Sequence, residues 1–299
     1  MNLEPIFKRF SLQTGGSPAS VGLVGAGEFG ATCVAQARRM QQLQVTAICD
    51  QNVERARKAA QDAGFDQTQV RVCADLPQAL RAQTQGCVAI VDSASLLARL
   101  PTAAVLEATG DPQAAAATAR ACLEAGRHVV LATKEAEIVV GPELARLAGA
   151  HGVVCAPVDG DQPSLLIGLV EWARLLGLPV VAAGKSSESD FVWNPADGHI
   201  TAWGRSADVP AFGPHFAPAD TRQSGGWSAT LAARRALPFD MTTVPDLCEM
   251  GIVANHTGLM PDCEALHAPL ARTVELPSIF SPRKQGGVLN GTGRVDMFN

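Results

Sequence analysis

The stretch VGLVGAGEFG, residues 21–30, decides the fold of this chain. Its apolar beginning predicts a short strand, and residues 31–38 have the composition of a helix. Between them stands a G-x-G-x-x-G run, in which the first glycine permits a sharp turn, the second admits a pyrophosphate and the third lets helix and strand pack closely. Helix-start N–H groups then face the phosphates. The predicted cofactor-binding residues of this run are Gly25, Ala26, Gly27, Glu28, Phe29 and Gly30.

A second apolar segment, residues 45–49, predicts a strand that ends at Asp50, 20 positions beyond Gly30. Its carboxylate is suited to bond a ribose hydroxyl and to repel a phosphate, so we expect NAD or NADP, with NAD favoured. Arg55 and Arg57 weaken this preference, because a nearby arginine accommodates the phosphate. The alternative is a glycine-rich turn of another α/β protein, in which Asp50 caps the next helix.

Composition limits the classes of partner. A chain of 299 residues with 47% hydrophobic and 18% charged residues predicts a globular protein of two domains. The net charge of -5 offers no basic field for nucleic acid or anionic lipid, and no apolar run approaches the length of a membrane span. We therefore expect a small-molecule substrate, no nucleic acid, no membrane and a cytoplasmic location.

Cysteine and histidine spacing predicts no protein-ligated metal. The eight cysteines are scattered singly and never form a C-x-x-C pair, so they are expected to be reduced, buried small hydrophobes. The six histidines have no spacing typical of a metal site or a nucleophilic triad.

The first half of the chain alternates apolar and helical segments, which is typical of a doubly wound parallel sheet of Rossmann type. Strand ends collect polar residues, because ligands of such sheets bind at the carboxyl edge. That edge would hold the glycine run, Asp50, Thr109, Gly110 and residues 133–135. The expected strands are 21–24, 45–49, 69–73, 88–91, 103–108, 128–132 and 152–158, and the expected helices include 53–63, 76–83, 93–100, 112–125 and 141–150.

The pattern changes near residue 160, so we expect an NAD(P)-binding domain over 1–160 and a smaller mixed α/β catalytic and dimerisation domain over 161–299. A helix over 164–176 and a short strand over 180–183, followed by Gly184 and Lys185, are predicted. Residues 4–10 predict a short N-terminal helix. No assignment is made for 191–238.

Seven segments together resemble a known group: VGLVGAGEFG, EATGDP, ATKEAEIVVGPEL, DGDQPSLLIGLVEWAR, VVAAGK, EMGIVANHTGL and GGVLNGTGRVD. In this order they are similar to homoserine dehydrogenase-like oxidoreductases of the deoxyxylulose phosphate reductoisomerase-like, or DRL-type, branch. The resemblance covers most of the chain and implies an NAD(P)-binding domain, a catalytic domain and a homodimer.

Three departures from this group bear on function. Ser187, Glu188 and Ser189 stand where a second lysine is expected, which puts a phosphate clamp in doubt. Residues 240–246 replace a D-G-T-K-type stretch, so the substrate is expected to differ. Relatives continue into a C-terminal SAF-type domain, whereas this sequence ends at Asn299; that domain is expected to be absent or not included.

Four residues are candidates for catalysis. Lys185, after a buried strand, would polarise a carbonyl or exchange a proton with it, or else be a salt-bridged surface lysine. Asp161 would orient Lys185 or a substrate hydroxyl, or cap a helix. Lys134 would touch substrate or cofactor, or begin a helix. Glu249 lies on a predicted helix that the resemblance places near the active site.

The expected function is NAD(P)-dependent hydride transfer to or from a small hydroxy or keto metabolite, which could carry a phosphate. Two alternatives remain open. One is a sugar oxidoreductase of the Gfo/Idh/MocA type, whose usual Glu-Lys-Pro is replaced here by Thr133-Lys134-Glu135-Ala136. The other is a cofactor-binding sensor or scaffold that has lost catalysis.

Overall fold

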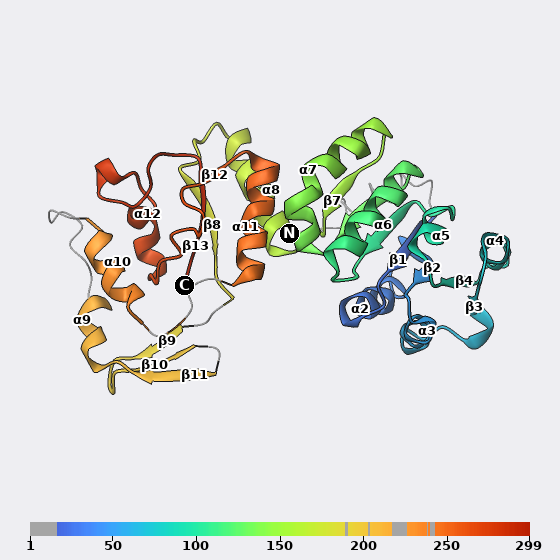
Figure 1. Ribbon diagram of the computed structural model, residues 1–299, viewed down its shortest axis with the longest axis horizontal. Coiled ribbons are helices and arrows are strands. Elements are labelled where there is room, and N and C mark those ends of the chain that lie inside the picture. Colours follow the sequence, from blue (N-terminus) through green and yellow to red (C-terminus); the bar gives the residue numbers. More distant parts are fainter. Residues whose placement is uncertain (1–16, 189–190, 203, 217–225, 238, 240–242) are drawn as a thin grey trace. The chain divides into compact units, whose positions relative to one another are not determined.

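A computed structural model describes residues 17–188, 191–202, 204–216, 226–237, 239 and 243–299 (Figure 1). The chain forms two compact units, Met1–Val158 and Asp159–Asn299. The expected N-terminal helix over 4–10 and residues 240–242 of the divergent stretch lie outside the described residues. No helix in the described part of the chain is both long enough and apolar enough to cross a bilayer.

The first unit is built on a seven-stranded sheet in which all neighbours are parallel. Its strand order is β3-β4-β2-β1-β5-β6-β7. The chain first adds strands on one side of β1 and then, from β5 on, adds them on the other side, so the order switches between β1 and β5. This confirms the predicted doubly wound fold. The strands are β1 (Ala19–Val24), β2 (Leu43–Cys49), β3 (Val70–Val72), β4 (Val88–Val91), β5 (Ala104–Glu107), β6 (His128–Leu131) and β7 (Cys155–Pro157).

Helices cover both faces of this sheet because successive strand residues point to opposite sides. Leu23 of β1 and Ile90 of β4 belong to one core, and Val24 and Val91 belong to the other. The first core packs against α2 (Glu28–Ala37) and α3 (Val53–Asp62). The second packs against α4 (Leu76–Thr84), α5 (Ala94–Ala98), α6 (Pro112–Glu124) and α7 (Lys134–Ala150).

The second unit contains two small sheets. One is parallel, with the order β12-β13-β8, and the other is antiparallel, with the order β11-β10-β9. Their strands are β8 (Ala182–Ser186), β9 (Phe191–Asn194), β10 (His199–Ala202), β11 (Arg205–Asp208), β12 (Met260–Pro261) and β13 (Arg294–Phe298). Figure 1 shows α8 (Gln162–Leu175) and α11 (Val244–Thr257) beside β8 and β13. The remaining helices are α9 (Gly213–Phe216), α10 (Ser228–Arg235) and α12 (Leu276–Ile279).

Three expected elements differ from the structure. Helix α7 begins at Lys134 and runs through Gly141 and Pro142, although a new helix was expected there. Ala136, Leu144 and Ala148, on both sides of the proline, are buried. Their burial stabilises a continuous helix by more than the loss of the backbone hydrogen bond that proline cannot donate. Strand β8 includes Lys185 instead of ending before it, and the unassigned region 191–238 contains β9, β10, β11, α9 and α10.

A buried ion pair stabilises the second unit. Arg234 is fully buried, and its Nη1 and Nη2 donate to the two carboxylate oxygens of Glu275 at 2.7 and 3.0 Å. Burial alone would raise the pKa of Glu275, but the hydrogen bonds from Arg234 and Arg272 outweigh it and lower that pKa from 4.5 to about 2. The stabilisation is therefore complete above about pH 4.5 and is lost as the pH falls towards 2.

We predict that Arg234→Met lowers the free energy of unfolding by about 3–5 kcal/mol, because it removes one partner of a buried ion pair. Arg235→Met is the matched control: the neighbouring guanidinium is exposed, and the same substitution there should cost about 1 kcal/mol or less. Urea unfolding at neutral pH measures both. Equal losses in the two variants would contradict a structural role for the pair.

Candidate functional site

The loop after β1 is closed so tightly that only glycine fits at two of its positions. A Cβ on Gly25 would lie 2.4 Å from the Ala108 carbonyl oxygen, and φ at Gly25 is +97°. A Cβ on Gly30 would lie 2.0 Å from the Gly25 carbonyl oxygen. Around Gly27, in contrast, no atom lies within 4 Å of the Cβ position. The loop is thus closed by the backbone of Ala108 at Gly25 and by its own backbone at Gly30, and it is open at Gly27.

Helix α2 begins immediately after this opening. Gly27 is its N-cap residue and contributes no side chain to cap the helix. N–H groups of a first helical turn lack partners within the helix and attract an anion together with the helix dipole. The open side of the loop therefore suits a pyrophosphate.

Asp50 ties the end of β2 to the glycine loop. Its Oδ2 accepts from the Ala26 N–H at 2.9 Å and its Oδ1 accepts from the Asn52 N–H at 2.8 Å. Arg55 lies 3.8 Å from Oδ2 and is mostly exposed. Each carboxylate oxygen accepts more than one hydrogen bond, so these contacts leave capacity for ribose hydroxyls.

Small-molecule and cofactor sites usually measure roughly 300–1,000 Å³. The cleft of the first unit has a volume of about 920 Å³, which lies in this range. It is lined by Gly25, Gly27, Asp50 and Thr109 from the predicted set; the other predicted loop residues and Gly110 do not line it. It also includes Asn52, Asp92 and Ser93, which the sequence analysis missed. The sequence could have indicated Asp92 and Ser93, because they directly follow the apolar strand 88–91 and therefore lie at the same edge of the sheet.

Glu107 joins the loops that follow β5 and β6. It is fully buried, and its Oε1 accepts from the Thr109 N–H at 2.7 Å and hydroxyl at 2.6 Å, and from the Thr133 hydroxyl at 3.1 Å. Thr133 Oγ1 in turn accepts from the Gly110 N–H at 3.1 Å. Glu107 thereby fixes two predicted cofactor-binding residues, Thr109 directly and Gly110 through Thr133. Lys134, a predicted catalytic residue, is the first residue of α7. An acid at the end of a buried strand was the signal for this role.

Lys185 lies in a buried cluster of charges in the second unit. Its ammonium donates to Asp246 Oδ1 at 2.8 Å and forms an ion pair with Glu249, and its side chain is 9% exposed. Asp246 and Glu249 come from α11 and are fully buried. Burial opposes ionisation of Asp246, but hydrogen bonds from Lys185 and from two hydroxyl groups outweigh it and hold its pKa below the usual value.

The structure brings together Lys185 and Glu249 and adds Asp246, which the sequence analysis did not single out. Asp161 does not pair with Lys185; it is the N-cap of α8, and its carboxylate accepts from the Gln162 N–H at 2.8 Å. The structure therefore gives no contact between Asp161 and Lys185 that would support the hypothesis that Asp161 orients this lysine. Ser187 and Thr243 donate to the second oxygen of Asp246 at 2.8 and 2.7 Å.

Burial makes three of the cysteines poor nucleophiles. All eight are free thiols, and burial raises the pKa of Cys49, Cys122 and Cys155 to about 12. Cys263 is exposed, contrary to the expectation that the cysteines are buried. Within the described residues, no group of three or more His, Cys, Asp or Glu side chains is arranged to hold a metal ion.

Comparison with known families assigns each half of the chain to oxidoreductases. Residues 19–132 match the family model described as oxidoreductase family, NAD-binding Rossmann fold, of the Gfo/Idh/MocA group. Residues 160–299 match the model described as oxidoreductase DRL, catalytic domain. The first match supports the Gfo/Idh/MocA alternative for this domain, and it ends just before Thr133-Lys134-Glu135-Ala136, where the usual proline is missing. No curated protein matches the chain significantly.

Solved structures with similar folds include three proteins whose TM-scores are all below 0.5. A probable dehydrogenase from Thermotoga maritima has 13% identity and a TM-score of 0.43, with 81% of this chain and 56% of that chain covered. The 1-deoxy-D-xylulose 5-phosphate reductoisomerase from Zymomonas mobilis has 21% identity and a TM-score of 0.42, with 57% of this chain and 46% of that chain covered. Biliverdin reductase from Synechocystis has 24% identity and a TM-score of 0.37, with 60% of this chain and 49% of that chain covered. The chain spans about half the length of these proteins.

The glycine loop generates a paired prediction. Gly30→Ala should lower the free energy of unfolding by about 1–3 kcal/mol, because the new methyl meets a backbone oxygen that cannot yield. Gly27→Ala should cost less than about 1 kcal/mol yet weaken NADH binding on the order of tenfold, since its methyl enters the open side of the loop. Urea unfolding and a fluorescence titration with NADH separate the two effects. Parent-like NADH affinity in Gly27→Ala would refute the assignment of the loop.

The environment of Asp50 predicts tighter binding of NADH than of NADPH, because its carboxylate accepts from a free ribose hydroxyl and repels a phosphate. Titration of both cofactors at one ionic strength measures this preference. Arg55→Ala should weaken NADPH further while leaving NADH near the parent value, because Arg55 is the guanidinium nearest Asp50. Much tighter binding of NADPH to the parent chain would show that the preference is wrong.

Proposed function

We propose that this protein is an NAD(P)-dependent oxidoreductase that transfers hydride to or from a small hydroxy or keto metabolite. The observation that carries the proposal is the glycine loop, which is closed by backbone at Gly25 and Gly30 and open at Gly27 beside the start of α2. The match of this domain to an NAD-binding family model supports it. When bound, the nicotinamide cofactor supplies or accepts the hydride.

Lys185 is the proposed group that acts on the substrate oxygen. Hydride addition to a carbonyl builds negative charge on that oxygen, and a fixed ammonium stabilises this charge more than it stabilises the neutral carbonyl. An ammonium carries three N–H groups, so the contacts to Asp246 and Glu249 leave a donor for the substrate. In this direction the ammonium gives a proton to the oxygen and becomes a neutral amine. In the opposite direction, the neutral amine of Lys185 takes the hydroxyl proton as the hydride leaves for the cofactor.

Asp246 and Glu249 are proposed as positioning residues for Lys185. Asp246 receives hydrogen bonds from Lys185, Ser187 and Thr243, and its low pKa keeps it ionised, so it holds the ammonium without taking its proton at neutral pH. Glu249 provides a second negative partner from one helical turn further along α11. A lysine held on two sides loses little entropy when it engages the substrate.

A sugar or polyol is the second candidate substrate class, favoured by the Gfo/Idh/MocA match of the first domain. The distinguishing experiment measures NADH and NADPH oxidation with keto acids, aldehydes, keto sugars and sugar phosphates, and the reverse reaction with the corresponding alcohols. Turnover with sugars alone would favour the second class. Cofactor binding without turnover on any substrate would favour a sensor or scaffold.

We predict that Lys185→Met lowers turnover by about 10²- to 10⁴-fold, the usual contribution of a positioned general acid. NADH affinity should stay near the parent value, because the residues proposed to bind the cofactor belong to the first unit. Steady-state kinetics with the identified substrate and an NADH titration provide the two measurements.

Two controls keep this test interpretable. Ser187→Ala removes one hydrogen bond to Asp246 but no charge, and its turnover should stay within a few-fold of the parent. Lys185→Met leaves two buried carboxylates without their cation, so its folding is checked by circular dichroism; if it unfolds, Lys185→Arg keeps the charge and displaces the donor. Parent-like turnover in a folded variant would make Lys185 a bystander, and equal losses of turnover and NADH affinity would make it a cofactor ligand.

A further inference from the structure

The second unit contains a cavity of about 480 Å³ that the proposed chemistry does not use. Its walls come from α10, from the segment that ends at Leu270, and from residues around Val288. The volume is in the range of small-molecule sites. Its apolar lining residues include Leu231, Ala232, Ala268, Pro269, Leu270 and Val288.

Part of the wall of this cavity lies on the opposite face of the β12-β13-β8 sheet from Lys185. Residues of a strand alternate between faces, and Ala183, two positions before Lys185, packs with Met250 of α11. Ala182, on the other face, packs against the apolar cluster that contains Val288, a lining residue of the cavity. Ala268, which also lines the cavity, belongs to the cluster of Ala183 and Met250, whereas Lys185, Asp246 and Glu249 do not line the cavity.

Two arginines supply the positive charge of the cavity. Arg235 Nη2 donates to the His267 carbonyl oxygen, and Arg283 Nε donates to the Val288 carbonyl oxygen at 3.1 Å. A guanidinium has five N–H groups, so one backbone contact leaves most donors of each arginine available. No carboxylate of the described residues forms an ion pair with either arginine, and the lining contains no Asp or Glu.

The nearby carboxylates are occupied elsewhere. Asp296 is buried and accepts from His267 Nδ1 at 2.6 Å and from the His267 N–H at 2.9 Å. Asp262 lies 3.2 Å from Arg294 and accepts from a backbone N–H at 3.1 Å. Their side chains are 1% exposed, so they do not offset the arginines at the cavity surface.

The wall next to Arg235 has a strained backbone. Leu266 and Ala268 have φ of 57° and 40°, a region that residues other than glycine rarely adopt. Asp296 holds this segment by accepting the Ala268 N–H at 3.1 Å, and the segment presents the His267 carbonyl to Arg235. Strain of this kind persists where a fixed shape is required, as at ligand-binding loops.

We infer that this cavity binds a small organic anion with an apolar body and a carboxylate or phosphate group. Guanidinium groups bind both oxyanions through paired N–H donors, and the apolar walls bury the rest of the molecule. On a chain with a net charge of -5, two unpaired arginines beside one cavity select for such a ligand. This site is independent of the proposed hydride transfer.

Calorimetric titration of the whole chain with benzoate and, separately, with phenyl phosphate tests the inference. At least one probe should bind the parent chain, and Arg235→Gln and Arg283→Gln should each weaken that binding on the order of tenfold or more. The probe that binds more tightly identifies the head group. Both substitutions are at exposed positions, and urea unfolding confirms that the variants are folded.

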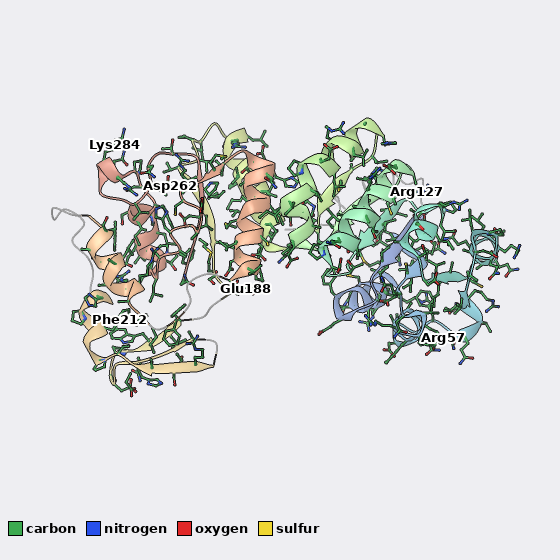
Figure 2. All side chains as sticks on the ribbon, viewed as in Figure 1. Arg57, Arg127, Glu188, Phe212, Asp262 and Lys284 are labelled. Carbon is green, nitrogen blue, oxygen red and sulfur yellow. The ribbon has the colours of Figure 1, made fainter. Side chains whose placement is uncertain are left out.

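Lys284→Gln is the matched control, because it removes one positive charge beside Arg283 from an exposed residue outside the cavity lining (Figure 2). Its affinity for the probe should stay within about twofold of the parent. Three outcomes would overturn the inference: neither probe binds, both arginine variants bind as the parent does, or Lys284→Gln weakens binding as much as they do. The last result would mean general charge attraction, and unchanged arginine variants would mean binding at another place such as the glycine loop.

Discussion

The contact between Gly30 and the carbonyl oxygen of Gly25 is the constraint on which the first unit depends. The two backbones approach so closely that a methyl group would lie 2.0 Å from the oxygen. This approach brings the start of α2 against the end of β1, and Asp50 secures it from β2 through the Ala26 N–H. The same closure leaves Gly27 as the open position. The fold and the proposed cofactor site therefore follow from one packing requirement and not from separate features of the sequence.

Buried charge organises the second unit in a comparable way. Its parallel sheet has three strands, and each face of the sheet carries a cluster of paired titratable side chains. On one face, Lys185 meets two carboxylates of α11; on the other, Asp296 meets His267. Arg234 and Glu275 form a third buried pair. Removing one partner of such a pair lowers the free energy of unfolding by more than the intact pair adds to it. A substitution of one partner is therefore poorly tolerated unless the other partner changes as well.

Local sequence predicted the first unit well because its signals are local. Strand 88–91 has the predicted bounds, because its four apolar residues follow Gly86-Cys87 and end at the polar Asp92. Asp246, in contrast, contacts Lys185 across 61 residues, and its stretch differed from the resembling group, so no local pattern indicated the pair. The strands β9, β10 and β11 have four residues each and only partial burial, which gives a weak period-2 signal. Pro142 suggested the start of a new helix, because the sequence alone does not show that residues before and after this proline are buried on one continuous helix.

The charges around Lys185 also limit what can bind there. One lysine and two carboxylates have formal charges that sum to -1, and Glu188 follows β8 where a second lysine was expected (Figure 2). A phosphate in contact with this cluster would meet two buried negative groups at low effective dielectric, where repulsion is weakly screened. A neutral carbonyl or hydroxyl avoids that cost and still accepts from the ammonium. On the proposal that Lys185 acts on the substrate oxygen, this cluster favours a substrate whose reacting end is uncharged, and a phosphate on that substrate would be bound away from Lys185.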